Sequence, residues 1–381
     1  MKIYCILFDT APLHDMFVEF AKKNDANLSC QISNSHTASS VLSMLTGETP
    51  SDLENNDFNI HKSWFRNGDK VYSKKFPWNN KTITEKLINK GWKVNFHNSH
   101  TIIKDVCSNE EYTRTTAYPG GLKKEEELWW NSKLIVETTL GNSKKTEGFY
   151  DDEKKYIKKV QEQREGNEFH FILYHQHHIA EQIGGKYDES YNRLNLLLNH
   201  WDLSEPNSFF YIFADHGLYS KIDRYQSPPY SWYTWSITKD NITNRIPRHI
   251  NSIMDFSPTI SDIIGSDGFY ENSTSIYDII DENRIYLIED SRFSVSDMKT
   301  TNFAAVKVIS WQGKQPVEFL QLVYHKPENK YKVFLYNTAD KRINVCSQYK
   351  GFVSELNSLP PEHLDIKNKL ENRLKEKGIL I

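Results

Sequence analysis

Cysteine is scarce in this chain, and the few residues present lie far apart in its 381 positions: Cys5, Cys30, Cys107 and Cys346. No two of them form a close pair, so the sequence contains neither the spacing of a zinc knuckle nor a disulfide framework. A fold held together by structural zinc or by disulfides is therefore not indicated.

Long apolar runs are also missing. The first run, Ile3 to Phe8, is shorter than the core of a signal peptide or a membrane span, and an acid, Asp9, follows it. We interpret it as the first strand of the fold, and no other segment is long enough for a transmembrane helix. We therefore expect a soluble, cytoplasmic protein without a membrane span.

A formal net charge of −3 leaves no excess of basic residues, so non-specific binding to nucleic acid is not expected. Aromatic residues are abundant, at 13% of the chain, which suits a large core and a lined pocket. A chain of 381 residues can form one large α/β domain with a smaller appendage.

The first three quarters of the chain alternate short apolar runs with amphipathic segments, which is typical of a layered α/β domain. The apolar runs predict strands at 2–8, 92–96, 169–174, 209–214 and 232–237. The amphipathic or charged segments predict helices at 13–23, 37–46, 82–89, 151–165, 187–201 and 256–264. The polar, irregular segment 105–150 is interpreted as an insertion or a lid.

The pattern changes near residue 285, where short β-prone runs follow one another with turns between them. They predict a small antiparallel sheet with strands at 284–288, 304–309, 319–324 and 332–336, and a charged helix at about 361–377. We therefore predict two domains, 1–284 and 285–381.

Polar residues stand where the predicted strands end. Asp9 follows the first strand, Asp215 and His216 follow the strand at 209–214, and Thr37 opens a predicted helix. Each has a plain alternative on its own: Thr37 can be an N-cap, and the acids can belong to polar turns or caps. In an open α/β sheet, however, ligands bind at the carboxyl ends of the strands.

Taken together, these residues offer oxygen and imidazole ligands without a thiolate. Asp9, Thr37, Asp215 and His216 thus form a candidate site for a divalent cation, with Mn, Mg, Ca and Zn all acceptable. A hydroxyl at a helix N-terminus also lies where a phosphate or sulfate is favoured. A cation touching the Thr37 hydroxyl would lower its pKa and make it a nucleophile.

The order of these segments resembles the alkaline phosphatase/sulfatase superfamily. In that family a first strand ends in Asp, here Asp9, and the nucleophile opens a helix that ends in Thr-Gly, here Thr37 to Thr46-Gly47. A later strand ends in Asp-His-Gly, here 215–217, and the segment 255–265 is similar to a further signature. The resemblance implies an alkaline-phosphatase-like sandwich: a central, mostly parallel sheet flanked by helices, with a small C-terminal antiparallel subdomain and a terminal helix.

The departures from the sulfatase pattern argue against a sulfatase that uses formylglycine. Sulfatases carry a Cys or Ser that becomes formylglycine, whereas this chain has Thr37, whose extra methyl would leave a ketone. Val41 stands where sulfatases have Arg, and Thr10 replaces the second Asp of many of them. A Thr nucleophile is similar to the phosphodiesterase and the phosphoglycerol or phosphoethanolamine transferase branches.

The resemblance also suggests residues that contact the substrate. His175 and His178, which follow the predicted strand 169–174, match a family position that binds the substrate anion or a second metal. Lys239 matches a sulfatase anion-binding lysine. The alternatives are a surface histidine cluster and an exposed lysine. Asp255 is expected to cap the helix that begins at residue 256.

These observations predict a metal-dependent hydrolase or transferase that acts on phosphate or phosphonate esters of a small molecule or glycan, through a phosphothreonine at Thr37. His175 or His178 would protonate the leaving group or hold the anion. Two alternatives stay open: a sulfate-ester hydrolase without formylglycine, and a non-catalytic binding protein on the same fold. The number of metal ions and the oligomeric state are left open by the sequence.

Overall fold

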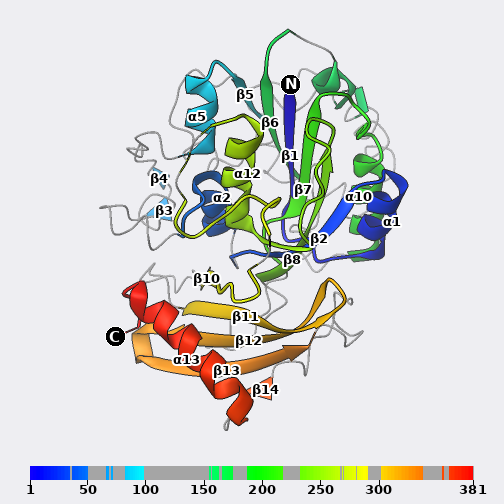
Figure 1. Cartoon of the computed structure of the whole chain (residues 1–381). Helices are drawn as coiled ribbons and strands as arrows, with labels where there is room; N and C mark the ends of the chain where they lie inside the picture. The colour runs from blue at the N-terminus through cyan, green and yellow to red at the C-terminus, as the bar shows by residue number, and fades with distance from the viewer. Residues whose placement is uncertain are drawn as a thin grey trace. The chain divides into compact units, whose positions relative to one another are not determined.

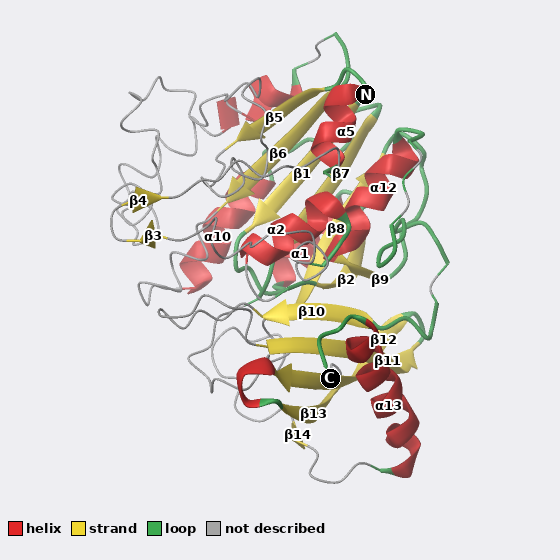
Figure 2. Ribbon diagram, turned by 90° about the vertical axis from the view of Figure 1, so that its left-hand side faces the viewer, coloured by secondary structure: helices red, strands yellow, loops and turns green. Residues whose placement is uncertain are grey.

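The computed structural model describes residues 1–34, 37–49, 66–67, 70–71, 82–97, 154–155, 157–162, 165–174, 187–217, 232–266, 268, 270–279, 281–290, 302–337, 354–355 and 360–380. Within these ranges the larger sheet has seven strands in the order β5-β6-β1-β7-β8-β2-β9 (Figures 1 and 2). Their bounds are β1 Lys2–Phe8, β2 Asn27–Ile32, β5 Lys93–His97, β6 Glu168–Tyr174, β7 Ser208–Ala214, β8 Tyr233–Asp240 and β9 Ile250–Ser252. A short hairpin pairs β3 (Arg66–Asn67) with β4 (Lys70–Val71).

The strands of the larger sheet run mostly parallel. β1 pairs in parallel with β6 and with β7, β5 with β6, and β2 with β9, whereas β8 is antiparallel to β7. Every residue of β1, β6 and β7 is buried. Strands that are covered on both faces read as continuous apolar runs, which is why the sequence predicted these three.

Helices cover both faces of this part of the sheet. α5 (Ile83–Asn89) lies on one face, and α1 (Asp15–Lys23) and α10 (Tyr187–Leu198) lie on the other (Figures 1 and 2). α1 begins after His14, whose Nδ1 accepts a hydrogen bond from the Met16 amide, and it buries Met16, Phe17 and Phe20. The predicted layered α/β fold with a mostly parallel central sheet is confirmed.

A second, antiparallel sheet lies in the C-terminal part of the chain. Among the described residues it contains β10 Tyr286–Asp290, β11 Asn302–Gln312, β12 Gln315–His325, β13 Lys330–Asn337 and β14 Ser354–Glu355, with the 3₁₀ turn η2 (Lys326–Glu328) between β12 and β13. Each neighbouring pair is antiparallel. The terminal helix α13 spans Pro361–Glu376. The small antiparallel sheet and terminal helix expected from the sequence are therefore present.

Alternation along these strands gives the second sheet two apolar faces. One face packs with residues that precede it in sequence and includes Ala304, Val306, Phe319, Val323, Trp232 and Ile250. The other face packs against α13, which lies along β11 and β12 (Figure 2), and includes Phe303, Leu320, Leu322, Leu370 and Leu374. Both faces of this sheet are thus buried, although its strands do not consist of continuous apolar runs.

Contacts divide the chain into two compact units. Unit 1 comprises Met1–Leu28, Thr84–Ala214 and Ser236–Ile246, and unit 2 comprises Ser29–Ile83, Asp215–Trp235 and Pro247–Ile381. Within unit 2 the second sheet packs with earlier segments of the chain, and the domain division 1–284 and 285–381 stays a prediction. No described helix is both long enough and apolar enough to cross a bilayer.

Asp255 stands at the expected N-cap position of the helix that follows it, but its side chain does not form the cap. Its side chain makes no cap bond to α12 (Phe256–Ile263). Instead it closes the capping box of the 3₁₀ helix η1 (Ile253–Asp255), where Oδ2 accepts from the Ser252 amide at 2.7 Å. The carboxylate turns back to this amide because two guanidinium groups lie on that side.

Those guanidinium groups belong to Arg248 and Arg284. Arg284 binds both oxygens of Asp255, with Nη2–Oδ1 at 2.6 Å and Nη1–Oδ2 at 2.9 Å, and Arg248 Nη2 also contacts Oδ2. Burial raises the pKa of Asp255, but the two guanidiniums lower it more, so the pKa lies below its ordinary value. This buried cluster joins η1, β9 and the start of β10 within unit 2.

We expect Asp255→Asn to lower the free energy of unfolding by roughly 3–5 kcal/mol, because it leaves two buried guanidiniums without their anion. Urea unfolding followed by circular dichroism measures this, with Asp365→Asn on the exposed side of α13 as control.

The loss of unfolding free energy in Asp255→Asn should also depend on pH. The folded-state pKa of Asp255 is depressed, so its contribution is complete above the unfolded pKa of about 3.9 and disappears as the pH falls through the folded value. The difference between wild type and Asp255→Asn should therefore shrink on acidification below about pH 4; a difference that grows there would contradict the assignment.

Candidate metal centre

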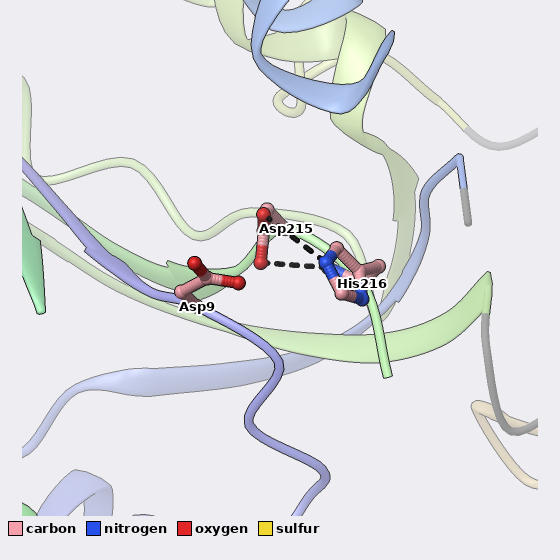
Figure 3. Close-up of side chains that lie close together, drawn as sticks. All are labelled: Asp9, Asp215 and His216. Atoms are coloured by element: carbon pink, nitrogen blue, oxygen red, sulfur yellow. Dashed lines mark hydrogen bonds and ion pairs between the residues drawn. The ribbon is translucent and has the colours of Figure 1, made fainter. Parts of the chain in front are cut away.

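The register of β1 and β7 places two carboxylates side by side. Phe8 pairs with Ala214 at the carboxyl ends of these parallel strands, so Asp9 and Asp215 are the next residues on each. In the described part of the chain, Asp9, Asp215 and His216 form a buried group whose ligand atoms all lie within 4.8 Å of one another (Figure 3). We call these three residues the DDH cluster.

Asp9 is held by its backbone and by its neighbour. Its amide donates to the Tyr174 carbonyl at 2.9 Å, which continues the pairing of β1 with β6. Thr10 then adopts φ +58°, a conformation that a β-branched residue rarely takes. In this conformation the Thr10 hydroxyl donates to Asp9 Oδ1 at 2.8 Å. The strained turn therefore fixes one oxygen of the Asp9 carboxylate.

The hydrogen bonds of His216 assign its tautomer. Nδ1 lies 2.6 Å from the Gly217 carbonyl oxygen, and because a carbonyl can only accept, the proton belongs on Nδ1. In the neutral ring the lone pair is then on Nε2, which lies 3.6 Å from Asp215 Oδ2. The His216 amide donates to the other oxygen, Oδ1, at 3.0 Å. Nε2 and Asp215 Oδ2 thus present lone pairs to the same space.

This donor set fits a divalent cation. Two buried carboxylates within a few ångströms repel each other unless positive charge lies between them. A histidine whose Nδ1 is held by a carbonyl and whose Nε2 is turned to carboxylates has the arrangement usual for a metal ligand. Oxygen and imidazole ligands suit Mn, Mg, Ca and Zn alike, so the cluster leaves the choice among these ions open.

The strand before Thr37 runs in the same direction as β1 and β7. The Ser33 amide donates to the Trp232 carbonyl and Gln31 bonds to Thr234, so β2 and β8 are antiparallel. Because β8 is also antiparallel to β7, β2 is parallel in direction to β7. The helix α2 (Thr37–Thr46) therefore follows a carboxyl strand end, as Asp9 and Asp215 do, and it begins at the predicted residue.

The remaining predicted site residues are described only in part. The side chain of Thr37 and the whole of His175 and His178 lie outside the described residues. Lys239 is described, and its Nζ donates to the Asp25 carbonyl at 2.7 Å. In the sheet Lys239 pairs with Phe210, near the amino end of β7 and the opposite end from Asp215. The structure therefore does not bring Lys239 to the DDH cluster.

Asn34, which holds the start of α2, was not among the residues predicted from the sequence. Its buried side chain donates to the Ser39 carbonyl and to the Ser43 hydroxyl, both at 3.0 Å, and accepts from the Glu289 amide of β10 at 3.0 Å. Ser40 Oγ donates to the Asn34 carbonyl at 3.1 Å. One amide side chain thus joins the first turns of α2 to β10 within unit 2. The sequence feature that could have indicated this role of Asn34 is its position just before the predicted helix 37–46.

Comparisons with known proteins bear on the fold. No family model matches the sequence, and no curated protein matches it. A solved structure described as a protein in the alkaline phosphatase superfamily, from Vibrio parahaemolyticus, matches 99% of this chain and 87% of its own, with a TM-score of 0.56 and 11% sequence identity.

The chain has the fold of the alkaline phosphatase superfamily. The C-terminal periplasmic domain of EcEptC from Escherichia coli matches 73% of this chain and 86% of its own at 13% identity, with a TM-score of 0.39. The alkaline phosphatase of the Antarctic bacterium TAB5 matches 70% of this chain and 99% of its own at 10% identity, with a TM-score of 0.40. The match to the Vibrio parahaemolyticus structure confirms, as a fold, the alkaline-phosphatase-like sandwich expected from the ordered motifs.

We expect the DDH cluster to bind one divalent cation and Asp215→Asn to weaken that binding by about a hundredfold or more. Titration of the chelator-treated protein with Mn²⁺ and Zn²⁺, followed by calorimetry and by the midpoint of thermal unfolding, measures both the affinity and the stabilisation. Asp25→Asn, at a fully exposed carboxylate, is the control. Equal affinity in Asp215→Asn and wild type would show that the cation binds elsewhere.

We expect Asn34→Ala to cost about 1–3 kcal/mol for each buried group that it leaves without a partner, chiefly the Glu289 amide. Chemical denaturation measures the loss. Asn199→Ala is the comparison: this exposed residue just after α10 bonds to Asn195 and accepts a solvent-exposed bond from Lys23, so its loss should change stability by less than about 0.5 kcal/mol. Similar losses in both variants would count against the bridging role of Asn34.

Proposed function

We propose that this chain is a metal-dependent enzyme that hydrolyses or transfers a phosphate or phosphonate ester, with Thr37 as the nucleophile. The observation that carries the proposal is the DDH cluster: two buried carboxylates and an imidazole lone pair meet where two parallel strands end. That edge is where open α/β sheets bind their ligands. The fold of the alkaline phosphatase superfamily agrees with a phosphoester hydrolase or transferase.

The metal would be held by Asp9, Asp215 and His216, with the Thr37 oxygen as a further proposed ligand. When bound, a divalent cation would supply Lewis acidity at the reacting oxygens and neutralise charge on the phosphoryl group. The Thr10 hydroxyl holds the Asp9 carboxylate and the Gly217 carbonyl holds the His216 ring, so both would be pre-oriented as ligands. These supporting contacts are what a ligand set needs to keep its geometry during the reaction.

The protein's own groups would then carry the chemistry. Thr37 would lose its proton to solvent, its oxygen would attack phosphorus, and the bond from phosphorus to the ester oxygen would break, which leaves a phosphothreonine. Backbone N–H groups in the first turn of α2 would hold the equatorial oxygens, since a helix N-terminus favours anions. His175 or His178 is proposed to protonate the leaving group or to hold the anion. Water, or an acceptor hydroxyl, then breaks the Thr37–phosphate bond.

The proposed substrate is a phosphoester of a small molecule or glycan, handled in the cytoplasm. Hydrolysis and transfer share the first half of the reaction and differ only in what attacks the phosphothreonine. An assay of that first half is therefore informative whichever acceptor completes the reaction.

We expect metal-dependent turnover of an aryl phosphate monoester, an aryl phosphodiester or a phosphonate ester in the presence of Mn²⁺, Mg²⁺, Ca²⁺ or Zn²⁺. Thr37→Ala should lower kcat roughly 10³-fold or more because it removes the attacking oxygen. Thr37→Ser keeps a hydroxyl and should retain part of the activity. Thr243→Ala, at an exposed hydroxyl that bonds to Asp240, should match wild type.

Each remaining outcome has a definite meaning. Turnover of an aryl sulfate alone would favour a sulfate-ester hydrolase without formylglycine. Binding of metal without turnover of any ester, and without phosphate trapped on Thr37, would favour a binding protein on this fold. Full activity in Thr37→Ala would refute the proposed nucleophile.

A further inference from the structure

A cavity of about 360 Å³ lies within unit 2, and no residue of the DDH cluster lines it. It is formed by the segments around Asn272 and Asn283 and by Arg373 of α13. Its size is within the range of cavities that hold small-molecule ligands. None of the functions proposed above uses it.

Three guanidinium groups line this cavity: Arg248, Arg284 and Arg373. The first two share a single buried carboxylate, Asp255, which lies behind the lining. Asp255 is thus the shared buried negative charge for two guanidiniums that are largely removed from water, and the exposed Asp278 adds a smaller negative charge at Arg284. An excess positive charge held inside a protein is costly unless a further anion balances it.

Arg284 keeps unused hydrogen-bond donors. Of its five N–H groups, one on Nη1 and one on Nη2 donate to Asp255, and no other bond is made by this side chain in the described structure. Its plane is fixed by that bidentate contact and by the Tyr286 ring, whose centroid lies 4.9 Å from Cζ. The side chain is 16% exposed, so these remaining donors lie in a partly desolvated wall.

Burial lowers the pKa of Arg284, but Asp255 raises it more, so the pKa lies above its ordinary value. The guanidinium thus stays charged although it is buried. A charged, planar group with spare donors is the kind of group that binds carboxylate or phosphate through two parallel hydrogen bonds.

Arg373 supplies a second anion-binding group from α13. Its Nη2 donates to Asn272 Oδ1 at 2.7 Å and its Nη1 to Glu376 at 3.1 Å. The contact with Asn272 turns the guanidinium toward the cavity lining. The remaining N–H groups are not used by the described residues.

Two acids also line the cavity, but both are exposed. The Glu271 side chain is 68% exposed and pairs with Lys377, and Asp281 is exposed and accepts from the Asn283 amide. Charges in contact with water are screened more than buried ones. The buried wall of the cavity therefore favours negative charge, and the acids belong to its exposed rim.

We propose that this cavity binds the phosphate or carboxylate group of a small polar molecule, with Arg284 and Arg373 as the principal donors. Arg248 contributes charge but few donors, because its N–H groups bond to Ile250, Thr274, Ser275 and Asp255. The amide side chains of Asn272 and Asn283 at the lining suit hydroxyl groups on the rest of the ligand.

Three hexoses that differ in one group test this proposal: glucose 6-phosphate, glucuronate and glucose. Binding is measured by calorimetry on the full chain carrying Asp215→Asn, in chelator, so that the DDH cluster cannot hold a phosphate through a metal. We expect one or both of the anionic sugars to bind and glucose to bind at least about tenfold more weakly. The anionic sugar that binds more tightly identifies the group the cavity prefers.

Two substitutions locate the binding. Arg373→Gln removes a charge at a partly exposed position and should weaken binding about tenfold without unfolding the chain. Arg284→Lys keeps a positive charge beside Asp255 but loses the planar fork, and should weaken binding by a similar factor. Arg245→Gln, whose guanidinium bonds to Thr243 outside the cavity, should bind as the parent does.

Circular dichroism and thermal unfolding of each variant establish that it is folded before binding is compared. If neither anionic sugar binds, or if both substitutions leave the affinity unchanged, the cavity is not the proposed site. Failure here would leave the Thr37 assays unaffected, because those use the metal-loaded wild-type chain.

Discussion

The candidate chemistry of this chain depends on the in-register pairing of β1 with β7. Because Phe8 lies opposite Ala214, the next residue on each strand is an acid at the same level of the sheet. A slip by one residue would turn one of these side chains to the other face, since successive side chains alternate. The continuous burial of both strands makes such a slip costly. The apolar core thus sets the spacing of the polar site.

Three buried polar groups in this chain are stabilised in different ways. Asn34 is neutral, and peptide groups and a hydroxyl satisfy its side chain. Asp255 is charged, and two guanidiniums balance it with one positive charge to spare. Within the DDH cluster, by contrast, two carboxylates face an imidazole whose proton is directed to Gly217. The first group requires no ion, the second favours an anion nearby and the third favours a cation.

Much of the fold could be predicted because its central strands are apolar along their whole length. β1, β6 and β7 were predicted within a residue, and α2 was predicted with its observed bounds. β2 and β9 were not predicted, because β2 carries Ser29 and Gln31 at buried positions. Those side chains are satisfied by the Arg248 carbonyl and by Thr234, partners about 200 residues away in sequence. Propensity and periodicity contain no information about such partners.

The same lack of information about distant partners explains which residues of the site could be predicted from the sequence. Asp9, Asp215 and His216 stand directly after apolar runs, so strand pairing alone was enough to suggest that they meet. Lys239 was assigned by resemblance, but its register opposite Phe210 places it at the other end of β7. Asp255 was expected to cap α12, yet the competing partners Arg248 and Arg284 could be known only from the fold. Local signals thus predicted adjacency along strands but not the choice between competing partners.

Thr37, the proposed nucleophile, opens a helix whose position is fixed at both ends. Asn34 holds the first turns of α2, while Ser257 and Ser273 donate to the carbonyls of Met44 and Gly47 at its far end. Gly47 has φ +75°, and a Cβ there would lie 2.6 Å from Tyr270 Cδ1, so the helix can end in this way only at glycine. A group on a rigid element loses little entropy when it reaches its attacking position. The contacts at the Thr46-Gly47 end of α2 therefore help to hold the helix that Thr37 opens.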